Sequence, residues 1–130
     1  MVQDRRYNLG VMKCLTLHAQ WAEAIFALGK DVENRSWATT YRGPLAIHAS
    51  QRLDVTICEA LGLDPSAVRT GAILGVVTLI DCVTDSHSLW ALPGQFHWLF
   101  ENPRRCDIPI PFKGQRGLFA APDRARLARC

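Results

Sequence analysis

Several features that define common functional classes are missing from this chain of 130 residues. None of its five cysteines forms a CxxC pair, which argues against a zinc site and favours free thiols in a reducing compartment. There is no GxxxxGKS/T phosphate loop, no GxGxxG motif and no HExxH motif, so we expect no metal ion and no cofactor. No apolar run reaches the ~18 residues of a transmembrane helix, and residues 1–10 lack the apolar stretch of a signal peptide. We therefore expect a cytoplasmic protein without a membrane partner.

The composition that remains is that of an ordinary globular domain. Hydrophobic residues make up 48% of the chain and charged residues 21%. This length suits a single domain over residues 1–130, which buries roughly two-thirds of its unfolded surface and needs no disulfide bond to be stable.

Positive charge is concentrated towards one end of the sequence. The formal net charge is +3, yet residues 1–99 hold 8 Lys and Arg against 9 Asp and Glu, whereas residues 100–130 hold 7 against 3. This asymmetry points to an anionic partner, although a basic segment that only improves solubility explains it equally well. Arg104 and Arg105 stand side by side in this segment and are candidate phosphate contacts.

Hydrophobic periodicity predicts five or six strands and two or three helices. Strands are expected at residues 13–19, 31–41, 45–50, 71–83, 96–102 and 117–122, and helices at 19–30 and 51–62, with one more helical turn near Asp64. The run at 71–83 is almost continuously apolar, which is typical of a central strand. Because helices do not alternate with strands, the pattern favours an α+β protein built on a small mixed barrel over a doubly wound sheet.

Residues 29–37, with the sequence GKDVENRSW, carry four charges within six positions and end in tryptophan. Alternate side chains of a strand share a face, so Glu33, Arg35 and Trp37 are expected to point the same way, with Lys30 at the preceding turn. If Val32 faces the core, these charges line a groove beside the barrel. The alternative is a solvated Glu33–Arg35 pair without a function.

Two further polar residues are expected to reach the same groove. Arg42 arrives from the next turn and His48 from an otherwise apolar strand. Arginine offers paired donors to a phosphate, and glutamate and tryptophan can bind and stack a nucleobase. Each residue also has a structural alternative: Arg42 can cap a turn and His48 can be a core histidine. Trp21 and Trp37 can likewise belong to the core.

Three motifs together resemble the ASCH family, a branch of the PUA-like barrels: Lys-x-x-Glu-x-Arg-x-Trp at 30–37, Tyr-Arg-Gly-Pro at 41–44 and Ile-His-Ala-Ser at 47–50. The resemblance covers about residues 13–119. It implies a PUA-like mixed β-barrel and a nucleic-acid-binding module that recognises RNA or a modified nucleotide in a cleft beside the first motif. The predicted nucleic-acid-binding residues are Lys30, Glu33, Arg35, Trp37, Arg42, His48, His18, Trp21, Arg104 and Arg105.

The resemblance also leaves an enzymatic alternative open. One branch of the family hydrolyses N4-acetylcytidine with a Lys, a Thr and a Glu, and these positions correspond here to Lys30, Glu33 and Gly75. Two of the three differ, which argues against that amidohydrolase route. Another relative has ribonuclease activity, and His18 with His48 and Lys30 would supply the groups for metal-free RNA cleavage.

The candidate catalytic residues are therefore Lys30, Glu33 and His48. A small-molecule or protein-interaction adaptor is the third alternative. Residues 87–98 hold two His and two Trp at a spacing that fits no metal site. They predict a loop beside the cleft, with Trp90 or Trp98 available for stacking, although core packing is the favoured role for Trp98.

Overall fold

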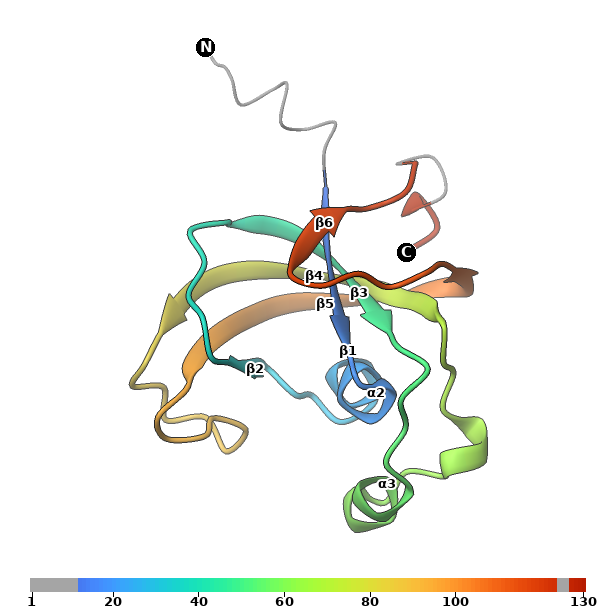
Figure 1. Cartoon of the computed structure of the whole chain (residues 1–130), viewed down its shortest axis with the longest axis horizontal. Coiled ribbons are helices and arrows are strands. Elements are labelled where there is room, and N and C mark those ends of the chain that lie inside the picture. The colour runs from blue at the N-terminus through green and yellow to red at the C-terminus, as the bar shows by residue number, and fades with distance from the viewer. Residues whose placement is uncertain (1–11, 124–126) are drawn as a thin grey trace.

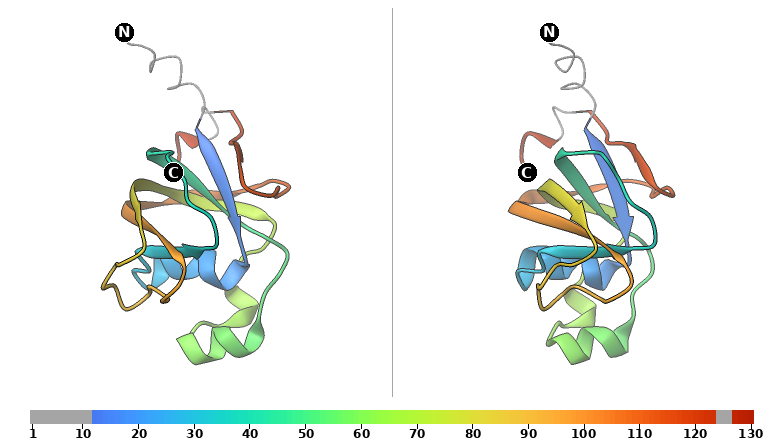
Figure 2. Two further views of the ribbon diagram at one scale, coloured as in Figure 1. Left: turned by 60° about the vertical axis from the view of Figure 1, so that its left-hand side comes forward. Right: turned by 90° about the vertical axis from the view of Figure 1, so that its left-hand side faces the viewer.

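A computed structural model describes residues 12–123 and 127–130. The elements in chain order are β1 (Lys13–Leu17), α2 (Ala19–Ala27), β2 (Val32–Arg35), β3 (Gly43–Ala49), α3 (Val55–Leu61), the 3-10 turn η1 (Pro65–Ala67), β4 (Ala72–Val83), β5 (Phe96–Pro111) and β6 (Leu118–Ala120). The strands form one sheet in the order β2-β5-β4-β3-β1-β6. The sheet curls into a half-barrel (Figures 1 and 2), which confirms the α+β class and the PUA-like architecture.

One pair of neighbouring strands determines where the polar loops meet. β1 and β3 run parallel, with Lys13 opposite Leu45 and Leu17 opposite Ala49, while the other paired strands are antiparallel. Parallel strands end at the same edge of a sheet. The segments that follow them are held together there by two backbone hydrogen bonds: Ser50 N–H donates to Leu17 O at 2.8 Å, and Ala19 N–H donates to Arg52 O at 2.8 Å.

The central strands are buried on both faces. The concave face packs against α2 in a cluster that includes Leu15, Ile25, Ile47 and Leu74. The opposite face contributes to a second hydrophobic cluster, which is formed by Cys14, Ala46, Ile73, Cys106, Ile110, Phe119 and Leu127. Because neighbouring residues of β1, β3 and β4 face different clusters, both kinds of position are apolar, which explains the continuous apolar run at 71–83.

Two strands differ from their predicted lengths. The strand expected at 31–41 ends at Arg35, because the chain leaves the sheet there and the Trp98 indole N–H donates to Trp37 O at 3.2 Å. The strand expected at 96–102 continues to Pro111. The second half of this strand contains charged residues and prolines, so its sequence does not show the pattern of a strand. Shifts of register against β4 accommodate these residues.

Helix α3 follows ordinary capping rules. The helix expected over 51–62 begins at Val55, because the Asp54 carboxylate caps it by accepting from Ile57 N–H at 3.0 Å. It ends at Gly62, whose φ of 77° lies in the left-handed region. Within the part of the chain that the structure describes, no helix is long and apolar enough to cross a membrane.

A disulfide bond joins Cys106 of β5 to Cys130, whereas we expected all five cysteines to be free. Burial of Leu127 and a 2.9 Å bond from Asp107 N–H to Arg129 O bring residues 127–130 back against β5. This return of the chain depends on tertiary packing and leaves no local pattern in the sequence. Cys14, Cys58 and Cys82 are free thiols.

Candidate functional site

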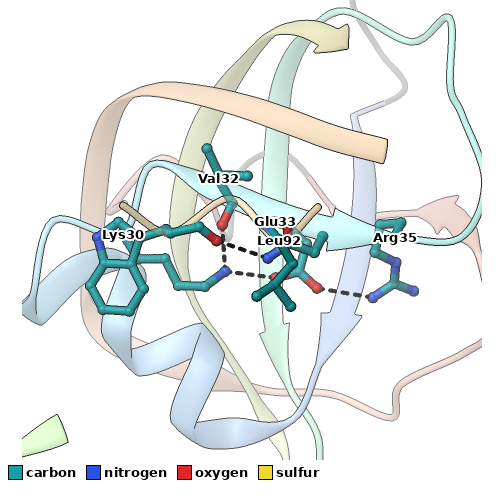
Figure 3. Close-up of polar contacts among 7 residues, drawn as sticks. Lys30, Val32, Glu33, Arg35 and Leu92 are labelled. Atoms are coloured by element: carbon teal, nitrogen blue, oxygen red, sulfur yellow. Dashed lines mark hydrogen bonds and ion pairs between the residues drawn. The ribbon is translucent and has the colours of Figure 1, made fainter. Parts of the chain in front are cut away.

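The charged motif at 30–37 forms a linked set of ion pairs (Figure 3). Lys30 Nζ lies 2.8 Å from Glu33 Oε1 and donates to Val32 O at 2.6 Å. Arg35 Nη1 lies 3.2 Å from the other carboxylate oxygen, Glu33 Oε2. Two cations therefore share one carboxylate, and the three side chains together carry a formal charge of +1.

Two of these three side chains are buried, and the third reaches the surface. Lys30 is 4% exposed and Glu33 is 7% exposed, so neither side chain lines an open cleft as we had expected. A buried ammonium requires partners, and here they are Glu33, the Val32 carbonyl and the Trp21 ring, whose centroid is 5.8 Å from Nζ. The Arg35 side chain, 22% exposed, reaches the surface in front of the buried pair.

Residues 84–95 form a loop that is fastened to β2 and β5. Asn34 donates to Trp90 O at 2.9 Å and accepts from Leu92 N–H at 2.9 Å. His97 Nδ1 accepts from Ser86 N–H at 3.1 Å. Trp98 is completely buried and belongs to the core, as its structural alternative predicted, whereas Trp90 is half-buried.

A groove runs along the edge where β1 and β3 end. It consists of three adjoining hollows that share lining residues, with volumes of about 540, 610 and 600 Å³. Arg35 and Trp37 line one end of it, Arg52 lies on the segment after β3, and Lys113 and Arg116 belong to the loop of residues 112–117. We call this surface the cationic groove and define it by Arg35, Trp37, Arg52, Lys113 and Arg116. Figure 1 shows the 112–117 loop crossing in front of β1 and β3 on its way to β6.

Positive charge dominates the cationic groove. Among its described lining residues the carboxylate is that of Asp54, which is already engaged in capping α3. The side chains of Arg52, Lys113 and Arg116 are exposed, and none of them makes a hydrogen bond or ion pair with residues 12–123 or 127–130. His18, also exposed, adds an imidazole where two of the hollows meet.

His48 forms part of the wall and holds the 112–117 loop in place. Its Nε2 lies 2.6 Å from Phe112 O, and because a carbonyl only accepts, Nε2 carries the proton. Nδ1 then accepts from the Thr16 hydroxyl at 3.2 Å, and Thr16 Oγ1 accepts from Gln115 N–H at 3.4 Å. His48 is 1% exposed, and burial lowers its pKa, which favours the neutral ring. This matches the core-histidine alternative.

Three predicted arginines lie outside the cationic groove, and each has protein partners. Arg42 pairs with Asp81 at 3.3 Å and donates to Thr39 O at 2.9 Å. Arg105 makes two bonds to the Glu23 carboxylate, at 2.9 and 3.0 Å. Arg104 donates to Asn102 O at 3.0 Å. The structure therefore brings His18, Arg35, Trp37 and His48 together, while Trp21 contacts Lys30 behind them.

Gly75, the position that the resemblance aligned with the glutamate of one hydrolytic branch, is closed by packing. A Cβ atom added to Gly75 would lie 2.6 Å from two carbons of the Phe26 ring and in collision with Arg104 O. Phe26 thus occupies the space that a carboxylate would need. The Phe26 ring of α2 can pack this closely against β4 because residue 75 is a glycine without a side chain.

The sequence indicated Lys113 and Arg116 only as members of the basic segment from Arg104 to Arg129, which we expected to add phosphate affinity, and it did not indicate Arg52. Lys113 and Arg116 belong to the basic segment at 100–130, which was the available signal, but nothing local distinguished them from Arg104 and Arg105. Arg52 follows the Ile-His-Ala-Ser motif by two residues. Its contribution depends on the parallel pairing of β1 and β3, which sequence spacing does not reveal.

Comparison with known proteins agrees with this architecture. The ASCH domain family matches residues 15–110. This chain belongs to the ASCH family. Activating signal cointegrator 1 of Mus musculus and the protein of the same name of Homo sapiens are each 30% identical to this ASCH domain over 134 residues. The match covers 87% of this chain and 23% of each relative, so the chain spans about a quarter of their length.

The family match divides the cationic groove of this ASCH domain. Arg35, Trp37 and Arg52 lie inside the matched residues, whereas the loop that carries Lys113 and Arg116 follows them in the chain. Three of the five residues that define the groove thus belong to the family's shared segment. The other two come from a loop that His48, in the shared segment, holds in position.

Proposed function

We propose that this ASCH domain binds RNA as a single strand in the cationic groove. The observation that carries the proposal is the convergence on one groove of three exposed cations, Arg52, Lys113 and Arg116, whose side chains have no partner among residues 12–123 and 127–130. Cations without protein partners favour an anionic ligand, and a run of phosphates presents several negative charges in a row. The groove is long enough to offer more than one contact, because its three hollows adjoin.

Arg35 and Trp37 support a single-stranded ligand in particular. The Arg35 guanidinium lies 5.6 Å from the centroid of the Trp37 ring, and both residues line the same hollow. A phosphate and an unstacked base could be held there together, because arginine binds phosphate and tryptophan stacks on bases. In a duplex the bases are stacked on each other and are not available to a side chain.

The same geometry favours binding over catalysis. A general acid or base needs a free proton-transfer position within hydrogen-bond reach of the substrate. Both ring nitrogens of His48 are occupied by Thr16 and Phe112, and Lys30 is buried against Glu33. A ribonuclease or amidohydrolase that uses these residues would need them to leave their present partners.

The test is a comparison of two double variants with the unaltered protein. Fluorescence anisotropy with a labelled single-stranded RNA, repeated over a range of salt concentrations, gives the affinity and its salt dependence. Arg52→Ala with Arg116→Ala should weaken binding and reduce the salt slope by about two contacts. Arg42→Ala with Arg104→Ala removes the same charge from outside the groove and should leave both quantities nearly unchanged.

Equal effects of the two double variants would mean that the groove is not the binding surface. If the unaltered protein binds no RNA at low salt, a small-molecule or protein-interaction adaptor becomes the leading function. Gel analysis of the RNA and chromatography of N4-acetylcytidine after incubation should show both unchanged. Robust product from the unaltered protein would make an enzyme the leading function instead.

A further inference from the structure

We infer that the hollow beneath the 112–117 loop is a nucleobase pocket that prefers the keto bases uracil and guanine to the amino bases cytosine and adenine. This inference rests on the proposed function and deepens it, because it assigns a base-reading role to one part of the cationic groove. We call this hollow the base pocket and define it by Ser50, Gln51, Phe112, Lys113 and Gln115, which line it with Arg116.

The size and floor of the base pocket suit a flat ring. Its volume of about 610 Å³ lies in the range of small-molecule sites. Two glycines form part of its lining, Gly71 and Gly114. A Cβ atom on Gly114 would lie 2.8 Å from Thr16 Oγ1 and 2.9 Å from His48 Cε1, so only a bare backbone allows the loop to approach this closely.

The aromatic wall of the base pocket is held rigidly before any ligand arrives. The Phe112 ring is stacked on Phe119, with centroids 6.2 Å apart and planes within 6° of each other. It also meets His48 edge-on at 6.5 Å, and the Phe112 carbonyl accepts from the same imidazole. A half-buried aromatic side chain fixed on two sides costs little further ordering when a base packs against it.

The polar groups of the base pocket determine which base edge fits. Lys113 and Arg116 offer only donors, and the described lining contains no Asp or Glu to accept from an amine. Uracil and guanine present a carbonyl oxygen at the position where cytosine and adenine present an amino group. A nearby cation attracts the carbonyl and repels the amine. Ser50, Gln51 and Gln115 can donate or accept and complete the remaining edge.

The base pocket is continuous with the phosphate-binding part of the groove. Thr16, Ser50, Gln115 and Arg116 line both the base pocket and the hollow that contains Arg35 and Trp37. One strand can therefore place a base beneath the 112–117 loop while its neighbouring phosphates reach Arg35 and Arg52. Arg35 and Arg52 consequently contribute to phosphate affinity from outside the base pocket, whereas Lys113 and Arg116 contribute to both affinity and base preference.

The experiment compares labelled homopolymers of uridine and of cytidine, each of about twelve nucleotides, a length within the usual range of single-strand sites. These two polymers carry the same backbone charge and differ at the base edge. The unaltered protein should bind the uridine polymer at least about fivefold more tightly, the effect expected when a charged donor loses its acceptor. Affinities come from anisotropy at a fixed salt concentration.

Variants separate base preference from phosphate affinity. Lys113→Glu replaces a donor by an acceptor on an exposed residue and should shift the preference towards cytidine. Lys113→Ala with Arg116→Ala removes both cations of the base pocket and should bring the affinity ratio of the two polymers close to one. Arg35→Ala should weaken binding of both polymers by the same factor and leave their ratio unchanged.

Each outcome decides between the two proposals. Equal binding of both polymers by the unaltered protein would overturn the base pocket and leave the RNA-binding groove intact. A uridine preference that survives both Lys113→Glu and the double alanine variant of Lys113 and Arg116 would also overturn it, because the preference would then arise elsewhere. Failure to bind either polymer would overturn both proposals.

Discussion

At the scale of single residues, the ion pairs of this ASCH domain consist of the same kinds of residue but differ in how deeply they are buried. Lys30 and Glu33 are almost completely buried, and their pairing is supplemented by the Val32 carbonyl. Arg42 and Asp81 form a pair of similar geometry at the surface, with side chains 40% and 54% exposed. Water solvates the second pair whether or not it forms, whereas the first pair depends on the protein groups around it.

Glu33→Gln should therefore destabilise the fold strongly. It leaves the Lys30 ammonium and the Arg35 guanidinium without their shared carboxylate, and removing one partner of a buried pair costs about 3 kcal/mol. The free energy of unfolding from urea titration measures this loss. Asp81→Asn is the matched control, since breaking an exposed pair should cost less than about 1 kcal/mol.

A second substitution tests whether the uncompensated charge of Lys30 causes the loss of stability in Glu33→Gln. Lys30→Met in the Glu33→Gln background removes the buried ammonium while keeping an unbranched side chain of similar length. It should recover part of the lost stability, because an apolar replacement of a buried pair is often close to neutral. A double variant as unstable as the sum of two independent losses would contradict a pairwise role.

At the scale of elements, a buried histidine holds each of two loops, 84–95 and 112–117. His48 of β3 bonds to Phe112 of the 112–117 loop, and His97 of β5 bonds to Ser86 and Leu92 of the 84–95 loop. Both rings use one nitrogen for a backbone carbonyl, so both are held in a defined tautomer. The loop that carries Lys113 and Arg116 is thus positioned by a buried ring rather than by regular secondary structure.

Stability should fall as the pH drops below about 6.5, the ordinary pKa of histidine in an unfolded chain. Burial lowers the pKa of His48 in the folded protein, so below pH 6.5 the unfolded chain binds a proton that the folded chain does not. The contribution is fully present above this pH and declines as the pH falls towards the lowered pKa. Urea titrations near pH 7.5 and near pH 5.5 measure the difference.

Two histidine substitutions test whether His48 causes this dependence of stability on pH. His48→Gln should reduce the difference in stability between the two pH values, whatever its effect at neutral pH. His18→Gln removes an exposed imidazole and should keep the difference found in the unaltered protein. If both variants behave alike, His48 is not the group that titrates.

At the scale of the whole molecule, two hydrophobic clusters enclose the central strands. One lies on the concave side beneath α2 and the other on the opposite side, where residues 127–130 return to β5. Leu127 belongs to the second cluster, and Cys130 is joined to Cys106. The last described residues are therefore part of the packed structure and not an appendage to it.

The disulfide predicts the number of thiols that react. Alkylation of the unreduced protein in denaturant should modify three of the five cysteines, namely Cys14, Cys58 and Cys82, and mass spectrometry counts them. Cys130→Ser should lower the free energy of unfolding by about 2–4 kcal/mol relative to the oxidised protein, since the bond closes a loop in the unfolded chain. Five modified cysteines in the oxidised protein would contradict this pairing.

Local patterns in the sequence were enough to predict several elements and the family. The apolar run at 71–83 became the central strand β4, and Asp54 and Gly62 bounded α3 as capping residues do. The motif at 30–37 led to the ASCH family, and strand alternation indicated that Glu33 and Arg35 would act together. These features depend on neighbours within a few positions along the chain, where spacing alone determines geometry.

Long-range packing determines which charged side chains face the solvent and which of them lie close together. Alternation along β2 says which side chains share a face, but partners from other segments made Lys30 and Glu33 buried and left Arg35 at the surface. The cationic groove joins residues 35, 52 and 113–116, which become neighbours because β1 and β3 end at one edge and His48 fixes the 112–117 loop there. Such long-range packing leaves no periodic trace in the sequence.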